Sequence, residues 1–142
     1  MSVRAAGAAD AAAIAGLLAE LGYEAAPAEV EGRLGGLERS AALVAELDGD
    51  TAGVLTLSMV PVLHEPGDWC RITMLVVAER ARRRGLARAL VGEAEKIARD
   101  HGCVRIEVTS APHRAGAHDL YRDAGYGQVS EHFLKPLAGA HA

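Results

Sequence analysis

The chain has 142 residues, of which 50% are hydrophobic and 24% are charged, a composition typical of a globular protein with room for one ordinary domain. No apolar run approaches the roughly 18 residues that span a membrane, and the first residues lack the segments of a secretory signal. The formal net charge of −4 disfavours general binding to nucleic acid. Two cysteines, Cys70 and Cys103, are too few for a disulfide scaffold or a four-cysteine zinc site, and we expect free thiols in a reducing cytoplasm.

The first part of the chain predicts a short strand followed by two helices. Residues 2–6 suit a strand, and the segment after Asp10 repeats apolar residues at helical spacing until Gly22, which favours a helix end. A second helix is expected over residues 27–37, because it starts at a proline, which suits a first helical turn.

Three strands are expected next. Residues 41–47 and 52–60 are apolar runs on either side of Asp48-Gly49-Asp50, whose turn-forming residues predict a hairpin. A loop with two prolines then leads to residues 69–77, a third apolar run that predicts a strand.

The remaining residues predict further helices and strands in alternation. A helix is expected over 85–101, a strand over 104–109, a shorter helix over 114–124, and two short strands or one bent strand over 126–137. Hairpin strands combined with such crossovers indicate an α/β (α+β mixed sheet) fold with helices on both faces. We expect one domain over residues 1–142.

A basic turn joins the strand at 69–77 to the helix at 85–101, and four of its five residues 80–84 are arginines. The first N–H groups of a helix lack internal partners and lie at the positive end of its dipole, so such a turn can bind a phosphate or pyrophosphate. Gly85 and Ala87 leave the backbone open to close approach. The sequence contains neither a Walker loop nor the three-glycine dinucleotide motif. The alternative is an arginine-rich turn that is only solvated.

Two motifs together resemble the GCN5-related N-acetyltransferase (GNAT) family. Arg82-x-x-Gly85-x-Ala87 resembles its pyrophosphate-binding signature, and Ala117-x-x-Leu120-Tyr121-x-x-x-Gly125-Tyr126 resembles a second element of the family. They stand in the family's order, with one helix and one strand between them, and the similarity covers essentially the whole chain, with residues 130–137 as a last strand. Arg114 stands where the family often has asparagine.

The resemblance implies the acyl-CoA N-acyltransferase fold, in which a mostly antiparallel central sheet contains a splayed parallel pair. It also implies acetyl-CoA as co-substrate, without a metal, and transfer of its acetyl group to an amine. A backbone N–H at the end of strand 69–77 would stabilise the oxyanion. The residues expected to bind the cofactor are Leu75, Val77, Arg82, Arg83, Arg84, Gly85, Leu86, Ala87, Arg88 and Arg114.

The reaction needs a proton donor for the leaving thiolate and a proton acceptor for the amine. By the resemblance Tyr121 is the acid, and the alternative is a packing tyrosine on an amphipathic helix. Glu107 is the candidate base, since burial on its strand would favour proton uptake. A water chain or another side chain is an open alternative, the side chains being His64, Glu65, Asp68, His113 and His118. The histidines lack the tight spacing of a metal site.

The acceptor is expected to be a small-molecule amine, because the chain is compact and has no appended domain. Glu20 and Glu24 beside the expected substrate wall at residues 21–23 either attract a cationic amine or are simply solvated. Protein N-termini and lysines are alternative acceptors, and a catalytically silent acyl-CoA-binding or sensor module is the alternative without chemistry. No nucleic-acid or membrane partner is expected, and the resemblance allows a homodimer.

Overall fold

The computed structural model describes residues 1–108, 115–129 and 133–138. The contacts of the chain divide it into two compact units, Met1–Thr109 and Ser110–Ala142. The single domain expected over residues 1–142 stays a prediction.

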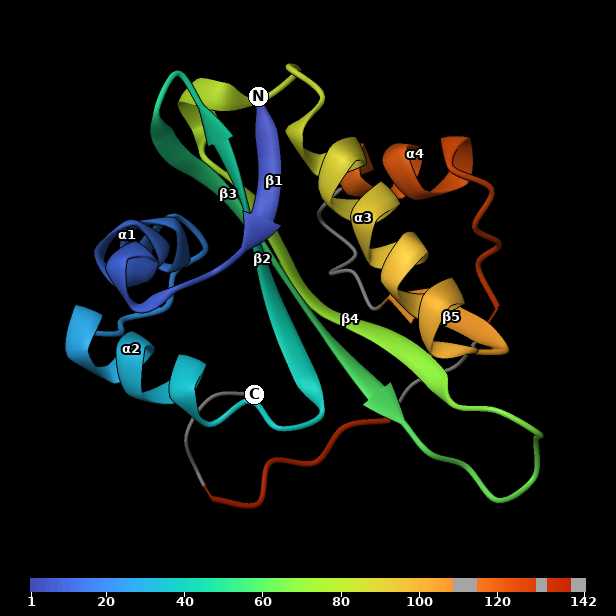
Figure 1. The fold of residues 1–142 in the computed structure, drawn as a ribbon. Helices are drawn as coiled ribbons and strands as arrows, with labels where there is room; N and C mark the ends of the chain where they lie inside the picture. The colour runs from blue at the N-terminus through green and yellow to red at the C-terminus, as the bar shows by residue number, and fades with distance from the viewer. Residues whose placement is uncertain (109–114, 130–132, 139–142) are drawn as a thin grey trace. The chain divides into compact units, whose positions relative to one another are not determined.

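The first unit contains one five-stranded sheet (Figure 1). Its strands have the same order in the sheet as in the sequence: β1 (Ser2–Ala5), β2 (Ser40–Leu47), β3 (Asp50–Val60), β4 (Trp69–Val77) and β5 (Arg105–Val108). The first four are antiparallel to their neighbours, whereas β5 runs parallel to β4. This confirms the predicted mixed sheet, which is mostly antiparallel and has one parallel pair.

The hairpin of β2 and β3 forms where turn residues interrupt two apolar runs. Asp48 (φ 54°) and Gly49 (φ 83°) both adopt the left-handed conformation, and the flanking residues Leu47 and Asp50 pair with each other. A two-residue turn of this kind matches the twist of the strands and needs residues that tolerate positive φ. The predicted hairpin is therefore confirmed together with its turn.

Helices cover both faces of this sheet. α1 (Ala11–Glu20) and α2 (Pro27–Gly35) lie on one side, and α3 (Leu86–His101) lies on the other (Figure 1). Each apolar side chain buried between these layers contributes about 1.5–3 kcal/mol to folding. The largest fully buried side chains include Leu55, Leu57, Ile72, Leu86 and Leu90.

The second unit contains the helix α4 (Ala115–Asp123). Gly125 (φ 93°) follows the end of this helix, and Tyr126 donates its N–H to the carbonyl of Tyr121 at 2.9 Å, which is a typical glycine helix end.

The strands expected over residues 126–137 are absent from the described part, residues 126–129 and 133–137. Two apolar side chains of this segment, Val129 and Phe133, are exposed. Gly127 and Pro136 also weaken strand pairing, since one adds backbone entropy and the other lacks an N–H. Residues 130–132 of the expected last strand lie outside the described residues.

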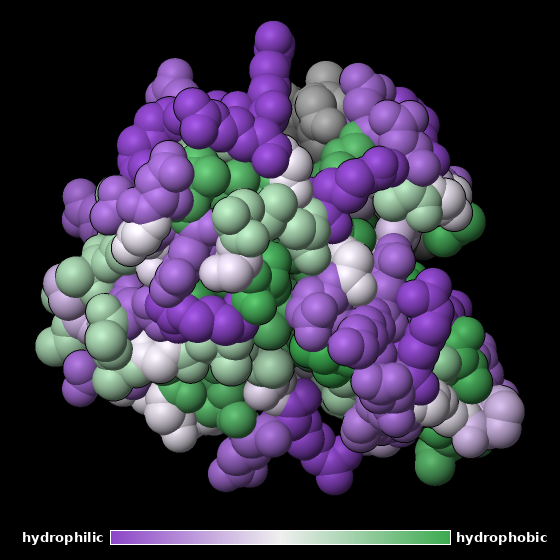
Figure 2. Space-filling model, turned by 45° about the horizontal axis from the view of Figure 1, so that its top comes forward, coloured by the Kyte–Doolittle hydropathy of each residue, from purple (hydrophilic) through white to green (hydrophobic). Residues whose placement is uncertain are grey.

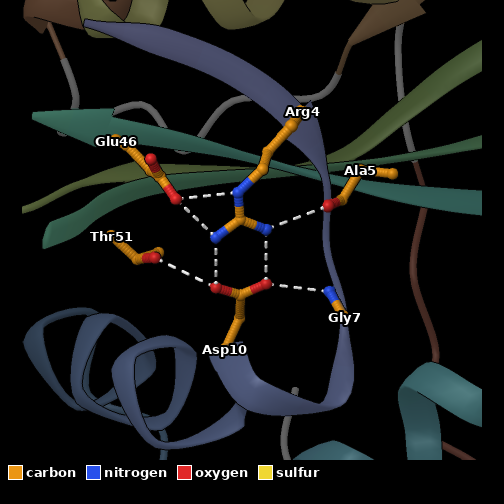
Figure 3. A network of polar contacts seen from close by, with 6 residues as sticks. All are labelled: Arg4, Ala5, Gly7, Asp10, Glu46 and Thr51. Carbon is orange, nitrogen blue, oxygen red and sulfur yellow. Dashed lines mark hydrogen bonds and ion pairs between the residues drawn. The ribbon is translucent and has the colours of Figure 1, made fainter. Parts of the chain in front are cut away.

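A partly buried ion pair links β1 to the start of α1 (Figure 3). The guanidinium of Arg4 donates two hydrogen bonds of 2.8 Å to the Asp10 carboxylate and also pairs with Glu46. Gly7 N–H and the Thr51 hydroxyl donate to the same carboxylate, which is only 5% exposed as a residue. The hydrogen bonds from Arg4, above all, lower the pKa of Asp10 to about 2.

We expect Asp10→Asn to lower the free energy of unfolding at pH 7 by about 2 kcal/mol, because a pKa depressed by roughly two units corresponds to stability of that order. The stabilisation is present above the ordinary pKa of 3.8 and is lost as the pH falls towards 2. Urea unfolding of the variant and the wild type should therefore converge between pH 4 and pH 2. Asp100→Asn, at an exposed position of α3, is the matched control, and an equal loss in both variants would contradict the assignment.

Candidate active site

One edge of β4 is only partly paired. Within the described residues β5 pairs with β4 only from Trp69 to Ile72, and residues 74–77 pair with β3 alone. A bulge at Thr73, where the register between β3 and β4 shifts, marks the same place. In the described part of the chain this edge of β4 therefore has no partner strand from Thr73 on, and we call residues 73–77 the open edge of β4.

Leu75 and Val77 present their main-chain groups at this open edge. The next residue, Ala78, donates its N–H to the carbonyl of Ala52 in β3 at 2.8 Å. Main-chain groups alternate from side to side along a strand, so Leu75 and Val77 direct their N–H and C=O groups away from β3. An extended ligand can hydrogen-bond there like an added strand. The cofactor contacts expected of these two residues stay a prediction.

The turn after β4 places backbone donors at the start of α3. Arg83 (φ 64°) and Gly85 (φ 83°) are both left-handed, and for a non-glycine residue this costs about 1–2 kcal/mol. Ala89 N–H bonds to the Gly85 carbonyl at 3.0 Å, so the N–H groups before Ala89 lie at the positive helix end without helical partners. Leu86 is 1% exposed; its side chain anchors the helix in the core and only its main chain can serve a ligand.

The arginines of this turn keep their charge available. Arg82, Arg83, Arg84 and Arg88 are exposed, and no ion pair joins any of them to a described residue. The upper part of Figure 1, where the turn lies, comes forward in Figure 2 and is mostly hydrophilic there. Backbone donors and unpaired guanidinium groups together suit a diphosphate.

Glu20 connects the end of α1 to this turn, which the sequence did not indicate. Its carboxylate accepts a 2.9 Å hydrogen bond from the N–H of Glu79, the first residue of the 3-10 helix η2 (Glu79–Ala81) that precedes the arginines. The expectation for Glu20 was attraction of a cationic amine or simple solvation. In the structure it instead caps η2, so the α1–α2 side and the turn after β4 are joined.

Glu20→Ala is expected to weaken the binding of CoA about three- to fivefold, because an exposed hydrogen bond to a charged group contributes roughly 1 kcal/mol. Glu20→Gln keeps an acceptor oxygen and should retain most of the affinity. Isothermal calorimetry with CoA measures both variants. Glu24→Ala, at the exposed position four residues further on, is the control, and equal affinities in all three variants would exclude a positioning role for Glu20.

Tyr121, the candidate acid, lies on α4 in the second unit. Tyr121 is 8% exposed. Its ring packs against the ring of Tyr126, with the two ring centroids 5.7 Å apart. Its role stays a prediction. Arg114, the remaining expected cofactor contact, lies outside the described residues.

Glu107, the candidate base, is held between two arginines rather than buried among apolar groups. Its side chain is 31% exposed. Arg71 Nε donates to Oε1 at 2.7 Å, and Arg105 donates to Oε2 at 3.2 Å. Taking up a proton therefore requires Glu107 to give up part of these contacts. The expected burial is not found, because the pairing of β4 with β5 places Arg71 directly opposite Glu107.

The other candidate bases are mostly engaged elsewhere. Glu65 accepts a hydrogen bond from the indole of Trp69 at 3.1 Å, and Asp68 pairs with His101 at 3.0 Å. His64 is exposed and packs edge-on against Trp69. His113 lies outside the described residues, as does the side chain of His118. Within the described residues no group of three or more metal-binding side chains occurs.

Comparison with known proteins matches most of the chain to the family that the sequence motifs resemble. The model of the acetyltransferase (GNAT) family matches residues 13–126. "GCN5-related N-acetyltransferase 4, chloroplastic" of Arabidopsis thaliana is 29% identical in an alignment of 89 residues that covers 57% of this chain and 31% of that protein. The chain thus spans about a third of the length of this curated relative.

Solved structures share the fold. A protein of Agrobacterium tumefaciens described as an acetyltransferase is 24% identical, with a TM-score of 0.86 over 96% of this chain and all of that one. The aminoglycoside N-acetyltransferase AAC(6')-Iy in complex with CoA is 14% identical, with a TM-score of 0.82 over 96% of this chain and 94% of its own. No helix in the described part of the chain is long and apolar enough to cross a membrane. With the mixed five-stranded sheet, the arginine turn and the family match in agreement, the chain belongs to the GNAT family of acetyltransferases.

Proposed function

We propose that this chain transfers the acetyl group of acetyl-CoA to the primary amine of a small molecule. The observation that carries the proposal is the continuity of two binding surfaces within one unit. The open edge of β4 at residues 73–77 leads directly into the donors and arginines of residues 82–88. The first surface suits the amide-bearing pantetheine arm, and the second suits the diphosphate.

In the proposed reaction the neutral amine attacks the thioester carbonyl directly. A new N–C bond forms, the C–S bond breaks, and the proton lost by the nitrogen goes to a base. An N–H at the open edge of β4 stabilises the negative charge on the carbonyl oxygen. Tyr121 gives its proton to the leaving thiolate, or donates a hydrogen bond to it, and the thiol product has an ordinary pKa of about 8.5.

The amine needs a base because the ordinary pKa of an alkyl ammonium is about 10.4. Glu107 remains the candidate. Glu107→Gln is expected to lower kcat at least about a hundredfold, since the amide oxygen can still accept a hydrogen bond from one arginine but the side chain takes no proton. Steady-state kinetics against both substrates measure this. A rise in KM with kcat unchanged would remove Glu107 as the base and leave water-mediated proton transfer.

The function is tested by following thiol release from acetyl-CoA against a panel of amines, with mass spectrometry of the products. We expect CoA and an acetylated amine in equal amounts. Small-molecule acetylation is also what the name of the aminoglycoside N-acetyltransferase in the comparison describes for that protein. Normal CoA binding without release for any amine, peptide or protein lysine would favour the silent acyl-CoA-binding module.

A further inference from the structure

The face of the sheet opposite α3 carries a row of charged and polar side chains beside the open edge of β4. A Cβ on Gly53 would lie 3.2 Å from Leu90 of α3 and 3.5 Å from Val77, so Gly53 and Val77 face α3. Following the register across the bulge, Ile72 faces α3 as well and is fully buried. Arg71 therefore lies on the opposite face, and its partner Glu107 lies there with it.

On this face Arg71, Glu107 and Arg105 form one continuous ladder. Glu107 bridges the two arginines through its two oxygens, and the Arg105 guanidinium stacks 3.3 Å from the centre of the Trp69 ring. Ion pairs and stacking hold both guanidinium groups in place. The side chains of Arg71 and Arg105 are nevertheless 43% and 46% exposed, so the ladder is accessible from solvent.

The charge of this ladder suits an anion. Two arginines and one glutamate leave a net charge of +1, and Nη1 of Arg71 donates to no described residue. Glu65 lies at the far end, on the Trp69 indole. Between Arg71 and the open edge lies a neutral pair of hydroxyls, Thr56 and Thr73, whose oxygens are 2.7 Å apart.

The strands near the open edge carry nothing that would hold a polycation. β4 contains no acidic residue, and β3 contains none after Asp50. Glu107, the nearest carboxylate of β5, is already neutralised by its two arginines.

The ladder lies where the acceptor substrate would approach the thioester. Arg71 and Thr73 remain accessible on the face opposite α3, the side of α1 and α2, since the Arg71 side chain is 43% exposed and Thr73 is exposed. An acceptor can therefore reach a thioester at residues 73–77 past these two residues. We propose that Arg71, braced by Glu107 and Arg105, binds a carboxylate of the acceptor, so that the substrate is an amine that also carries a carboxylate, such as an amino acid or short peptide. This inference rests on the proposed acetyl transfer and names its substrate class.

The test compares matched acceptors that differ only in the carboxylate: amino acids against their amides, and lysine against its decarboxylated diamine. Thiol release from acetyl-CoA should show a KM at least tenfold lower for each carboxylate form. Arg71→Gln should abolish this preference by raising the KM of the carboxylate forms, and Arg71→Lys should retain part of it. The Kd of CoA should stay unchanged in both variants, which also shows that they fold.

Arg99→Gln, at an exposed position of α3, is the control and should keep the preference. Faster acetylation of amides and diamines than of the carboxylate forms, or a preference that survives Arg71→Gln, overturns the inference and leaves the acetyltransferase function intact. Absence of release with every acceptor despite normal CoA binding contradicts the proposed function and the inference with it.

Discussion

Gly85→Glu is expected to abolish the binding of CoA while the protein stays folded. Gly85 is left-handed, a conformation that costs an ordinary residue about 1–2 kcal/mol. A glutamate there also places a negative charge at the donors proposed to bind the diphosphate. Loss of these contacts should weaken binding by at least a hundredfold, or about 2.7 kcal/mol, as measured by calorimetry.

Gly92→Glu separates this effect from a general effect of added charge. Gly92 is also on α3 and exposed, and a Cβ there meets nothing within 4 Å. It should bind CoA like the wild type. Gly85→Ala should lie between the two, because it introduces the backbone strain without the charge. Wild-type affinity in Gly85→Glu would refute the proposed diphosphate site.

Tyr121→Phe is expected to reduce kcat by about 10²–10⁴-fold, the contribution typical of a positioned general acid. The Kd of CoA should change little, because the phenol is assigned to the leaving sulfur and not to the nucleotide. Pre-steady-state thiol release and calorimetry measure the two quantities separately.

Tyr126→Phe is the matched control, because it also removes a phenol hydroxyl, from the neighbouring ring that packs against Tyr121. We expect it to retain kcat within about threefold. Equal turnover in Tyr121→Phe and the wild type would remove the role of Tyr121 as the acid.

Local signals predicted most elements of the fold. The apolar run at Trp69–Val77 gave both ends of β4, and the turn residues Asp48 and Gly49 located the hairpin. Gly85 and Gly102 marked the ends of α3, because both need positive φ. The strands expected over residues 126–137 are absent from the described part of that segment, where Phe133 is exposed.

The parts of the candidate site that depend on how the strands pair could not be predicted from the sequence. The open edge begins where the described pairing of β4 with β5 ends, at Ile72, and no local pattern records how far two strands pair. For the same reason Arg71, the partner of Glu107, was not recognised. The cap of Glu20 on Glu79 spans 59 residues of sequence. Of the site, only the arginine turn could be predicted from the sequence, because the residues that carry its chemistry are consecutive.

A crystal structure of the chain with CoA tests the central claim most directly. The account predicts the diphosphate on the main-chain N–H groups of residues 83–88, and the pantetheine arm hydrogen-bonded to Leu75 and Val77 along the open edge of β4. Density for CoA at any other place, with this edge and turn vacant, would contradict it.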